Sequence, residues 1–268
     1  MLNIFKEQQV VFMATALVVC ALVGGTRASA VELTVDISRY VYEETDDAGD
    51  FFMRDVSKPV FFSAGIRDWD QPAEDGKFGF MYNGELTYGK VDYSSNGTGT
   101  STTDYYKGRA EGYAVYRVNE LFTPFIGLGY RHLFDDDEGN RTSTGHVGYD
   151  RLSQYLYAPV GIRFAPVDKL SVKAQYNTFL AGRQTSYLTD ADSTLDGDAT
   201  NRQKKGWGVD FSANYQIDDT WATYGFFRHW DIKKSETTTI TTTNNVTYTG
   251  WEPDNTTQEI GIGVAYKF

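Results

Sequence analysis

The segment Thr257-Gln-Glu-Ile-Gly-Ile-Gly-Val-Ala-Tyr-Lys-Phe268 ends the chain and alternates apolar residues with polar or small ones. Because successive side chains of an extended strand point to opposite faces, one face collects the apolar residues Ile260, Ile262, Val264, Tyr266 and Phe268. A strand with one apolar face that stops at its last apolar residue indicates a transmembrane β-barrel. Strands of soluble sandwiches show the same alternation, so the remaining sequence must separate these two fold classes.

Ten stretches, including this one, alternate in the same way and predict an all-β fold, a single antiparallel transmembrane β-barrel. We expect strands at about 31–43, 58–68, 78–94, 105–118, 122–134, 151–165, 169–186, 205–217, 221–235 and 255–268. The connections between them alternate long and short, as extracellular loops and periplasmic turns do in such barrels, and 94–104 is one expected long loop. An even strand number places both termini at the end with the short turns.

Counts of eight or twelve strands are the alternatives. Eight would require two stretches around the first turn to merge, and twelve would require the Thr-rich stretch 237–248 to form an additional hairpin. We expect this stretch to extend the ninth and tenth strands outward, because Thr favours strands and Asn244-Asn245 can form the turn.

The N-terminus predicts a cleaved export signal at 1–30, followed by a barrel domain at 31–268. Lys6 precedes an apolar run at 10–24 that is too short to span a bilayer, and Ala28-Ser29-Ala30 offers the small residues of a cleavage site. A lipoprotein signal ending at Cys20 is disfavoured because Val19 is bulky. Cys20 is the only cysteine, so the predicted mature chain contains no thiol.

The composition excludes some classes of function. The formal net charge is -11, which argues against nucleic-acid binding. Aromatic residues make up 15% of the chain, as expected if aromatic girdles lie at the two membrane interfaces. The mean hydropathy of -0.44 does not oppose a membrane location, because a spanning barrel needs only every second residue to be apolar.

The two faces of the seventh and eighth strands can be assigned residue by residue. In the eighth, an apolar set containing Val209, Phe211 and Tyr215 alternates with a polar set containing Asp210 and Ser212. A charge that faces lipid at mid-depth costs roughly 2–4 kcal/mol, so the polar set should face the lumen. The reverse arrangement would be a soluble lipocalin-like barrel, which the leader and the terminal Phe disfavour.

The same counting places charges of both signs in the lumen. The inward residues are Glu32, Asp36, Glu85, Glu111, Asp210, Glu259, Arg67, Arg109, Arg117, Arg131, Arg163 and Lys173. In a small barrel this mixture predicts a network of ion pairs that plugs the bore, with Glu85 and Glu111 as the partners of Arg109. A narrow ion path is the alternative interpretation. We expect Arg228 on the outward face of the ninth strand, with Ala222, Tyr224 and Phe226, where it could pair with lipid phosphate.

The final strand resembles that of Gram-negative outer-membrane β-barrels, in which a terminal Phe after alternating apolar residues is recognised by the assembly machinery. The resemblance implies that Phe268, Tyr266, Val264 and Ile262 form the assembly signal. It also implies location in the outer membrane, with its lipid and lipopolysaccharide as neighbours. The chain is similar as a class to the small OmpA/OmpX-like and opacity-type barrels. That class implies envelope structure or surface interaction through the loops, or narrow porin-like transport, with an unidentified extracellular partner.

Catalysis and metal binding are weakly supported. Asp135-Asp136 near His132 loosely resembles the rim of the omptin proteases, but none of that family's surrounding sequence is present, so we predict no enzyme and keep a rim hydrolase as a distant alternative. The acidic loop clusters lack the spacing of an EF-hand. The sequence contains no phosphate-binding Gly-rich loop and no paired-Cys metal site, and it predicts no cofactor.

Overall fold

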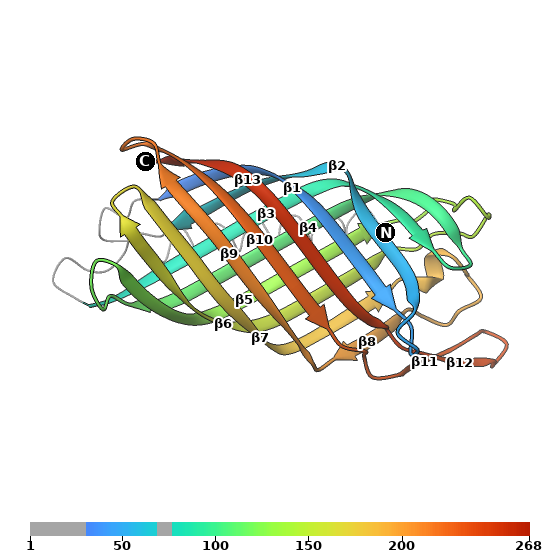
Figure 1. Ribbon diagram of the computed structural model, residues 1–268. Coiled ribbons are helices and arrows are strands. Elements are labelled where there is room, and N and C mark those ends of the chain that lie inside the picture. Colours follow the sequence, from blue (N-terminus) through green and yellow to red (C-terminus); the bar gives the residue numbers. More distant parts are fainter. Residues whose placement is uncertain (1–30, 69–76) are drawn as a thin grey trace.

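The protein folds as a closed antiparallel barrel (Figure 1). The computed structural model describes residues 31–68 and 77–268, so the expected leader at 1–30 and most of the second connection lie outside the described residues. Ten strands form the barrel wall, and β1 closes it by pairing with β13. These strands are β1 Glu32–Thr45, β2 Phe51–Asp68, β3 Phe78–Ser95, β4 Gly99–Tyr116, β5 Phe122–Asp136, β6 Arg151–Val167, β7 Leu170–Ser186, β9 Gly206–Gln216, β10 Trp221–Ile232 and β13 Asp254–Lys267.

Four short elements lie outside the closed wall, and the predicted count of ten strands is confirmed. The 3-10 turn η1 spans Leu188–Asp190, and β8 (Ala199–Gln203) pairs with the end of β7. The Thr-rich stretch forms a separate hairpin of β11 (Thr238–Thr241) and β12 (Thr247–Gly250), with Asn245 at φ 61° in its turn. The expected outward extension of the ninth and tenth strands is therefore wrong, because these Thr residues pair with one another and not within the wall.

The barrel has two unlike ends. The turn end contains the start of β1, the end of β13 and the connections 117–121, 168–169 and 217–220. The loop end contains the connections 46–50, 96–98, 137–150, 187–205 and 233–253. The expected long loop at 94–104 is wrong, because Gly99 already begins β4. Gly97 and Gly99 adopt positive φ angles of 108° and 89°, which permits a tight turn, and the Thr residues that follow favour a strand.

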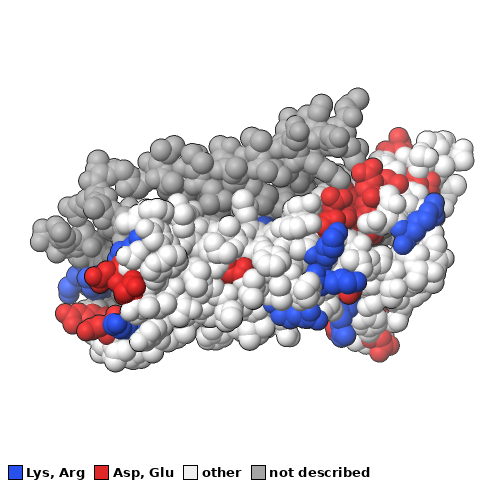
Figure 2. All heavy atoms as spheres, turned by 90° about the horizontal axis from the view of Figure 1, so that it is seen from above, with Lys and Arg blue, Asp and Glu red and all other residues white. Residues whose placement is uncertain are grey.

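An apolar belt surrounds the barrel between these ends. Outward residues of neighbouring strands are largely exposed, as in β1, where Val35 is 57% exposed, and in β13, where Ile262 is 65% exposed. Figure 2 shows Lys, Arg, Asp and Glu gathered at the two ends of the face in view, with a mostly white band between them. Among the described residues, no helix is long and apolar enough to cross a membrane. An apolar exterior around a polar interior is the arrangement of a barrel that crosses lipid with its strands.

Ion pairs mark the edge of this belt that is nearer the loop end, on the outward side of β2–β4. Lys58 bonds Asp92 at 2.8 Å and Lys90 bonds Asp104 at 2.9 Å; the first three side chains are about half exposed, and that of Asp104 is 34% exposed. Because outward charges avoid the hydrocarbon, the parts of these strands beyond this level project past the membrane.

Candidate functional site: the barrel lumen

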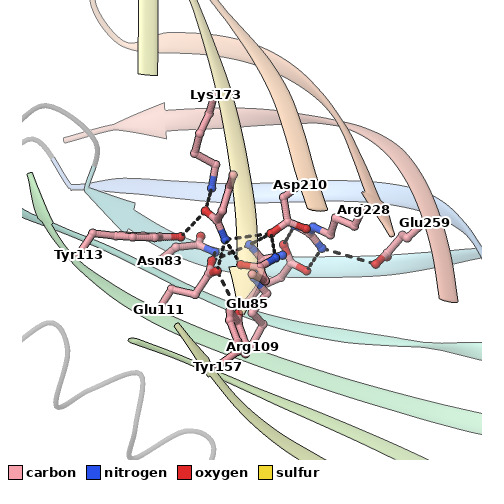
Figure 3. Close-up of polar contacts among 12 residues, drawn as sticks. Asn83, Glu85, Arg109, Glu111, Tyr113, Tyr157, Lys173, Asp210, Arg228 and Glu259 are labelled. Atoms are coloured by element: carbon pink, nitrogen blue, oxygen red, sulfur yellow. Dashed lines mark hydrogen bonds and ion pairs between the residues drawn. The ribbon is translucent and has the colours of Figure 1, made fainter. Parts of the chain in front are cut away.

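The centre of the lumen contains the charged residues that the alternation predicts there, and Arg109 lies in their midst. Its guanidinium donates to Glu111 at 2.6 Å and to Asp210, across the bore on β9, at 2.9 Å (Figure 3). The prediction named Glu111 and Glu85 as partners. Glu111 is one, whereas Glu85 bonds a different cation and Asp210 takes its place.

That different cation is Arg228, which was expected on the outward face of β10 but points into the lumen. Its two terminal nitrogens donate to the two carboxylate oxygens of Glu85 at 2.6 and 2.7 Å. Arg228 also lies 3.5 Å from Glu259 and 4.1 Å from the ring centre of Phe226. Ala222, Tyr224 and Phe226 are buried inside with it, while Trp221 and Phe227 face outward. The expectation of an outward Arg228 is wrong because both faces of this strand are aromatic, so apolarity does not distinguish them.

Lys107 is a second cation that the sequence analysis missed. Its ammonium donates to Glu259 at 2.6 Å, and Ser38 donates to the same carboxylate oxygen at 2.7 Å. Lys107 has the same strand parity as Arg109, so simple counting along β4 could have found it.

Amide and hydroxyl groups donate to further acceptors of the centre, while Oδ1 of Asp210 has no hydrogen-bond partner among the described residues. Gln175 donates to Glu111 at 2.8 Å and to Asp210 at 3.0 Å, and Tyr157 donates to Glu111 at 2.9 Å. Lys173 donates to the side-chain amide oxygen of Gln175 at 2.9 Å. Buried charges that are paired and hydrogen-bonded in this way form a rigid network.

The other predicted lumen residues lie on the turn-end side or the loop-end side of this centre. Toward the turn end, Arg67 donates to Glu32 at 2.6 Å, and Asp36 accepts from Tyr224 at 2.9 Å. Toward the loop end, Arg131 donates to Thr257 at 2.9 Å. Arg163 lines the turn-end part of the lumen, whereas Arg117 is exposed in the connection after β4.

An aromatic layer fills the lumen between the charged centre and the loop end, and the sequence analysis had assigned aromatic residues to the outer girdles alone. The rings of Tyr40, Phe61 and Tyr105 lie 5.2 to 5.8 Å apart, and Tyr157 packs edge-on against Trp230 at 4.9 Å. All five side chains are buried within one apolar cluster. Two cations on the turn-end side of this layer also make cation–π contacts with its rings. Lys107 lies 4.6 Å from the ring centre of Tyr40, and Arg131 lies 5.3 Å from that of Trp230.

Glycines on neighbouring strands make room for these rings. A Cβ atom at Gly129 would lie 2.3 Å from the ring of Tyr157, and one at Gly89 would lie 2.2 Å from the ring of Phe61. The absence of a side chain at these inward positions allows each ring to lie flat across the neighbouring strand. Inward glycine beside inward aromatic is a sequence signal that could have predicted the layer.

Beyond the layer, three buried carboxylates under the loops share one arginine. Arg151 donates to Glu44 at 3.1 Å, to Asp55 at 3.2 Å and to Asp135 at 3.0 Å. In the connection above, burial and then the negative charge of Glu44 raise the pKa of Glu252 to about 7. Negative charge therefore exceeds positive charge at this end of the lumen.

Three small cavities lie along the described lumen. Next to Glu85, Arg228 and Trp230 lies a cavity of about 20 Å³, and two cavities of about 40 Å³ follow toward the turn end. At the turn end itself, a hollow of about 300 Å³ lies beside Arg117 and Arg163. Since a water molecule needs roughly 10–15 Å³ by this measure, the inner cavities have room for one to a few waters each.

The histidines do not form the arrangement that the omptin resemblance suggested. His132 lies on the outward face of β5 beside Tyr130, whereas Asp135 points inward to Arg151. His229 is also outward and contacts Trp207, and His146 lies exposed in a loop. The predicted terminal residues Ile262, Val264, Tyr266 and Phe268 all lie on the outer surface. Within the described part of the chain, His, Asp and Glu form no group that could hold a metal ion.

Comparison with known proteins shows the fold and no closer kinship. No family model and no curated protein matches this chain. Among solved structures, the outer membrane protease OmpT from Escherichia coli is 10% identical with a TM-score of 0.55, and the match covers 91% of this chain and 99% of that one.

Two further solved structures resemble the chain less closely. Neisserial surface protein A is 12% identical with a TM-score of 0.41, covering 91% and 100% of the two chains. The translocator domain of autotransporter NalP from Neisseria meningitidis is 8% identical with a TM-score of 0.42, covering 98% and 97%. The chain has the fold of an outer-membrane β-barrel.

Proposed function

We propose that this protein is an integral barrel of the Gram-negative outer membrane whose lumen is closed and whose function resides in its loop end. The turn end would then face the periplasm, and the loop end would face the exterior. The observation that carries the proposal is the double closure of the lumen by the charged centre and the aromatic layer. A barrel filled in this way serves envelope structure or surface interaction, because its loops are the part left free to meet a partner.

A narrow, gated channel is the second candidate. It is favoured by the series of water-sized cavities that runs from the aromatic layer through the charged centre toward the turn end, which leaves the aromatic layer as the main barrier. These cavities share lining residues, since Arg109 lines the first two and Arg67 lines the second and third.

Single-molecule conductance in a planar bilayer separates the two candidates. The closed barrel should pass almost no current, and a Tyr157→Ala/Trp230→Ala variant, which removes part of the aromatic layer, should raise the conductance. Large, stable steps from the unmodified protein would refute the closed lumen and support the channel.

A further inference from the structure

Two inward arginines oppose each other on neighbouring strands next to the aromatic layer. The strand register places Arg109 on β4 directly opposite Arg131 on β5. Like charges in opposed positions repel one another. Each of these side chains is only 8% exposed, so solvent screens the repulsion weakly. The pair is therefore stabilised by any negative charge that lies close to it.

The protein supplies that negative charge to one arginine of the pair. Arg109 bonds Glu111 and Asp210, whereas Arg131 donates one hydrogen bond to the hydroxyl of Thr257. A ring face, such as that of Trp230 beside Arg131, attracts a cation but has no net charge. Within residues 31–68 and 77–268, Arg131 is thus a buried cation that bonds no carboxylate.

Each arginine also has one N–H group without an acceptor. In the described part of the chain, Nε of Arg109 and Nη1 of Arg131 are buried and have no hydrogen-bond partner. Both side chains line the cavity of about 20 Å³, and Trp230 of the aromatic layer lines it as well. A buried donor without an acceptor is costly, and more so when the donor is charged. An acceptor inside this cavity would therefore stabilise both arginines.

The wall of this cavity has more positive than negative charge. Its charged lining consists of the cations Lys107, Arg109, Arg131 and Arg228 and the carboxylates Glu85 and Glu259. Lys107 bonds Glu259 and Arg228 bonds Glu85, so both lining carboxylates are already paired. The hydroxyl of Thr257 also lines the cavity; it accepts from Arg131 and still has its own hydrogen to donate.

We propose that this cavity binds one monatomic anion, such as chloride, between Arg109 and Arg131. A water molecule needs roughly 10–15 Å³, so a volume of about 20 Å³ admits one particle of that size or slightly larger and excludes phosphate. Nε of Arg109, Nη1 of Arg131 and the hydroxyl of Thr257 are the donors. Water accepts the same hydrogen bonds, but only an anion also offsets the charge of Arg131. The site goes beyond the proposed function, because a closed barrel and a gated channel can each hold such an ion.

Urea unfolding in detergent micelles, with sodium chloride or sodium gluconate at the same concentration, tests this site through its effect on stability. Gluconate maintains the ionic strength and is too large for the cavity. If the dissociation constant is millimolar, about 100 mM chloride should lower the equilibrium constant for unfolding roughly a hundredfold relative to gluconate. Bromide should act as chloride does, and crystals grown in sodium bromide should show its anomalous scattering between the two arginines.

Arg131→Gln removes the cation that bonds no carboxylate among the described residues, and it should reduce the effect of chloride to about tenfold or less. Arg67→Gln is the matched control: it also removes an inward arginine, but one that bonds Glu32 and does not line this cavity, so the effect of chloride should remain.

Equal stability of the unmodified protein in chloride and gluconate would overturn the proposal and leave water as the occupant of the cavity. A chloride effect that persists undiminished in Arg131→Gln would also overturn it. If Arg131→Gln does not refold, crystals of the unmodified protein decide, and a cavity without bromide between Arg109 and Arg131 refutes the site.

Discussion

Replacing Arg228 by Met should strongly destabilise the barrel, because it leaves Glu85 charged and without its partner in the lumen. Arg228 supplies two short hydrogen bonds to this carboxylate, and the side chains are only 14% and 9% exposed. Hydrogen bonds to charged groups contribute about 1.5–3 kcal/mol each, and stranding one member of a buried ion pair costs about 3–5 kcal/mol. We therefore expect Arg228→Met to lower the free energy of unfolding by about 3–5 kcal/mol.

The double variant Glu85→Gln/Arg228→Met removes the stranded charge and should be less damaging than Arg228→Met alone. Urea unfolding in lipid vesicles measures the cycle, and we expect a coupling energy of at least about 2 kcal/mol. The exposed pair Lys58–Asp92 is the control, where coupling should stay below about 1 kcal/mol. If the effects of the two Glu85 and Arg228 substitutions simply add, the reasoning about the buried pair is wrong.

Three further changes test other parts of the molecule. Phe211→Arg, in the middle of the outward face of β9, should cost roughly 2–4 kcal/mol on refolding into vesicles, whereas Tyr215→Arg, on the same face near the turn end, should cost about 0–1 kcal/mol; similar costs would contradict the position of the belt. The folded-state pKa of Glu252, about 7, lies above its ordinary 4.5, so the stability that this carboxyl contributes is complete below about pH 4.5 and falls as the pH rises through 7. Glu252→Gln should flatten the pH dependence of the free energy of unfolding, measured with urea between pH 5 and 8. An unchanged pH profile would exclude the assigned burial of Glu252. Deleting Phe268 should block assembly but not export, and normal amounts of heat-modifiable protein in the outer membrane would show that the terminal residue is not the signal.

The faces of straight strands could be predicted from the sequence, because alternation of polar and apolar residues is unambiguous where one face is polar. This holds for β7 and β9, where Lys173 and Asp210 are inward as predicted. It fails for β10, whose two faces both contain aromatic residues. There the charge of Arg228 is the better guide, since it is buried on the same face as Tyr224.

The contacts across the lumen could not be predicted in the same way. Partners such as Glu85 and Arg228 lie 143 residues apart in the sequence. They meet only because the strand register and the closure of the barrel place them at the same height in the lumen. A local irregularity adds to the difficulty in β2, where the pairing shifts between Lys58 and Phe62. The alternation continues through this shift, because Ser57, Phe61 and Ser63 are all buried on the inner face, but the shift changes the level at which Phe61 meets its neighbours.

The unequal lengths of the strands give the loop end a slanted rim. Three neighbouring strands, β2, β3 and β4, contain 18 residues each, whereas β9 and β10 contain 11 and 12. At about 3.3 Å per residue, the long side has roughly 20 Å more strand than the short side. An approaching partner therefore meets the projecting hydrogen-bonded strands β2–β4 on the long side of the rim. On the short side it meets the small elements β8, β11 and β12. Sequence changes in these small elements can reshape the low side of the rim while the wall beneath it keeps its register.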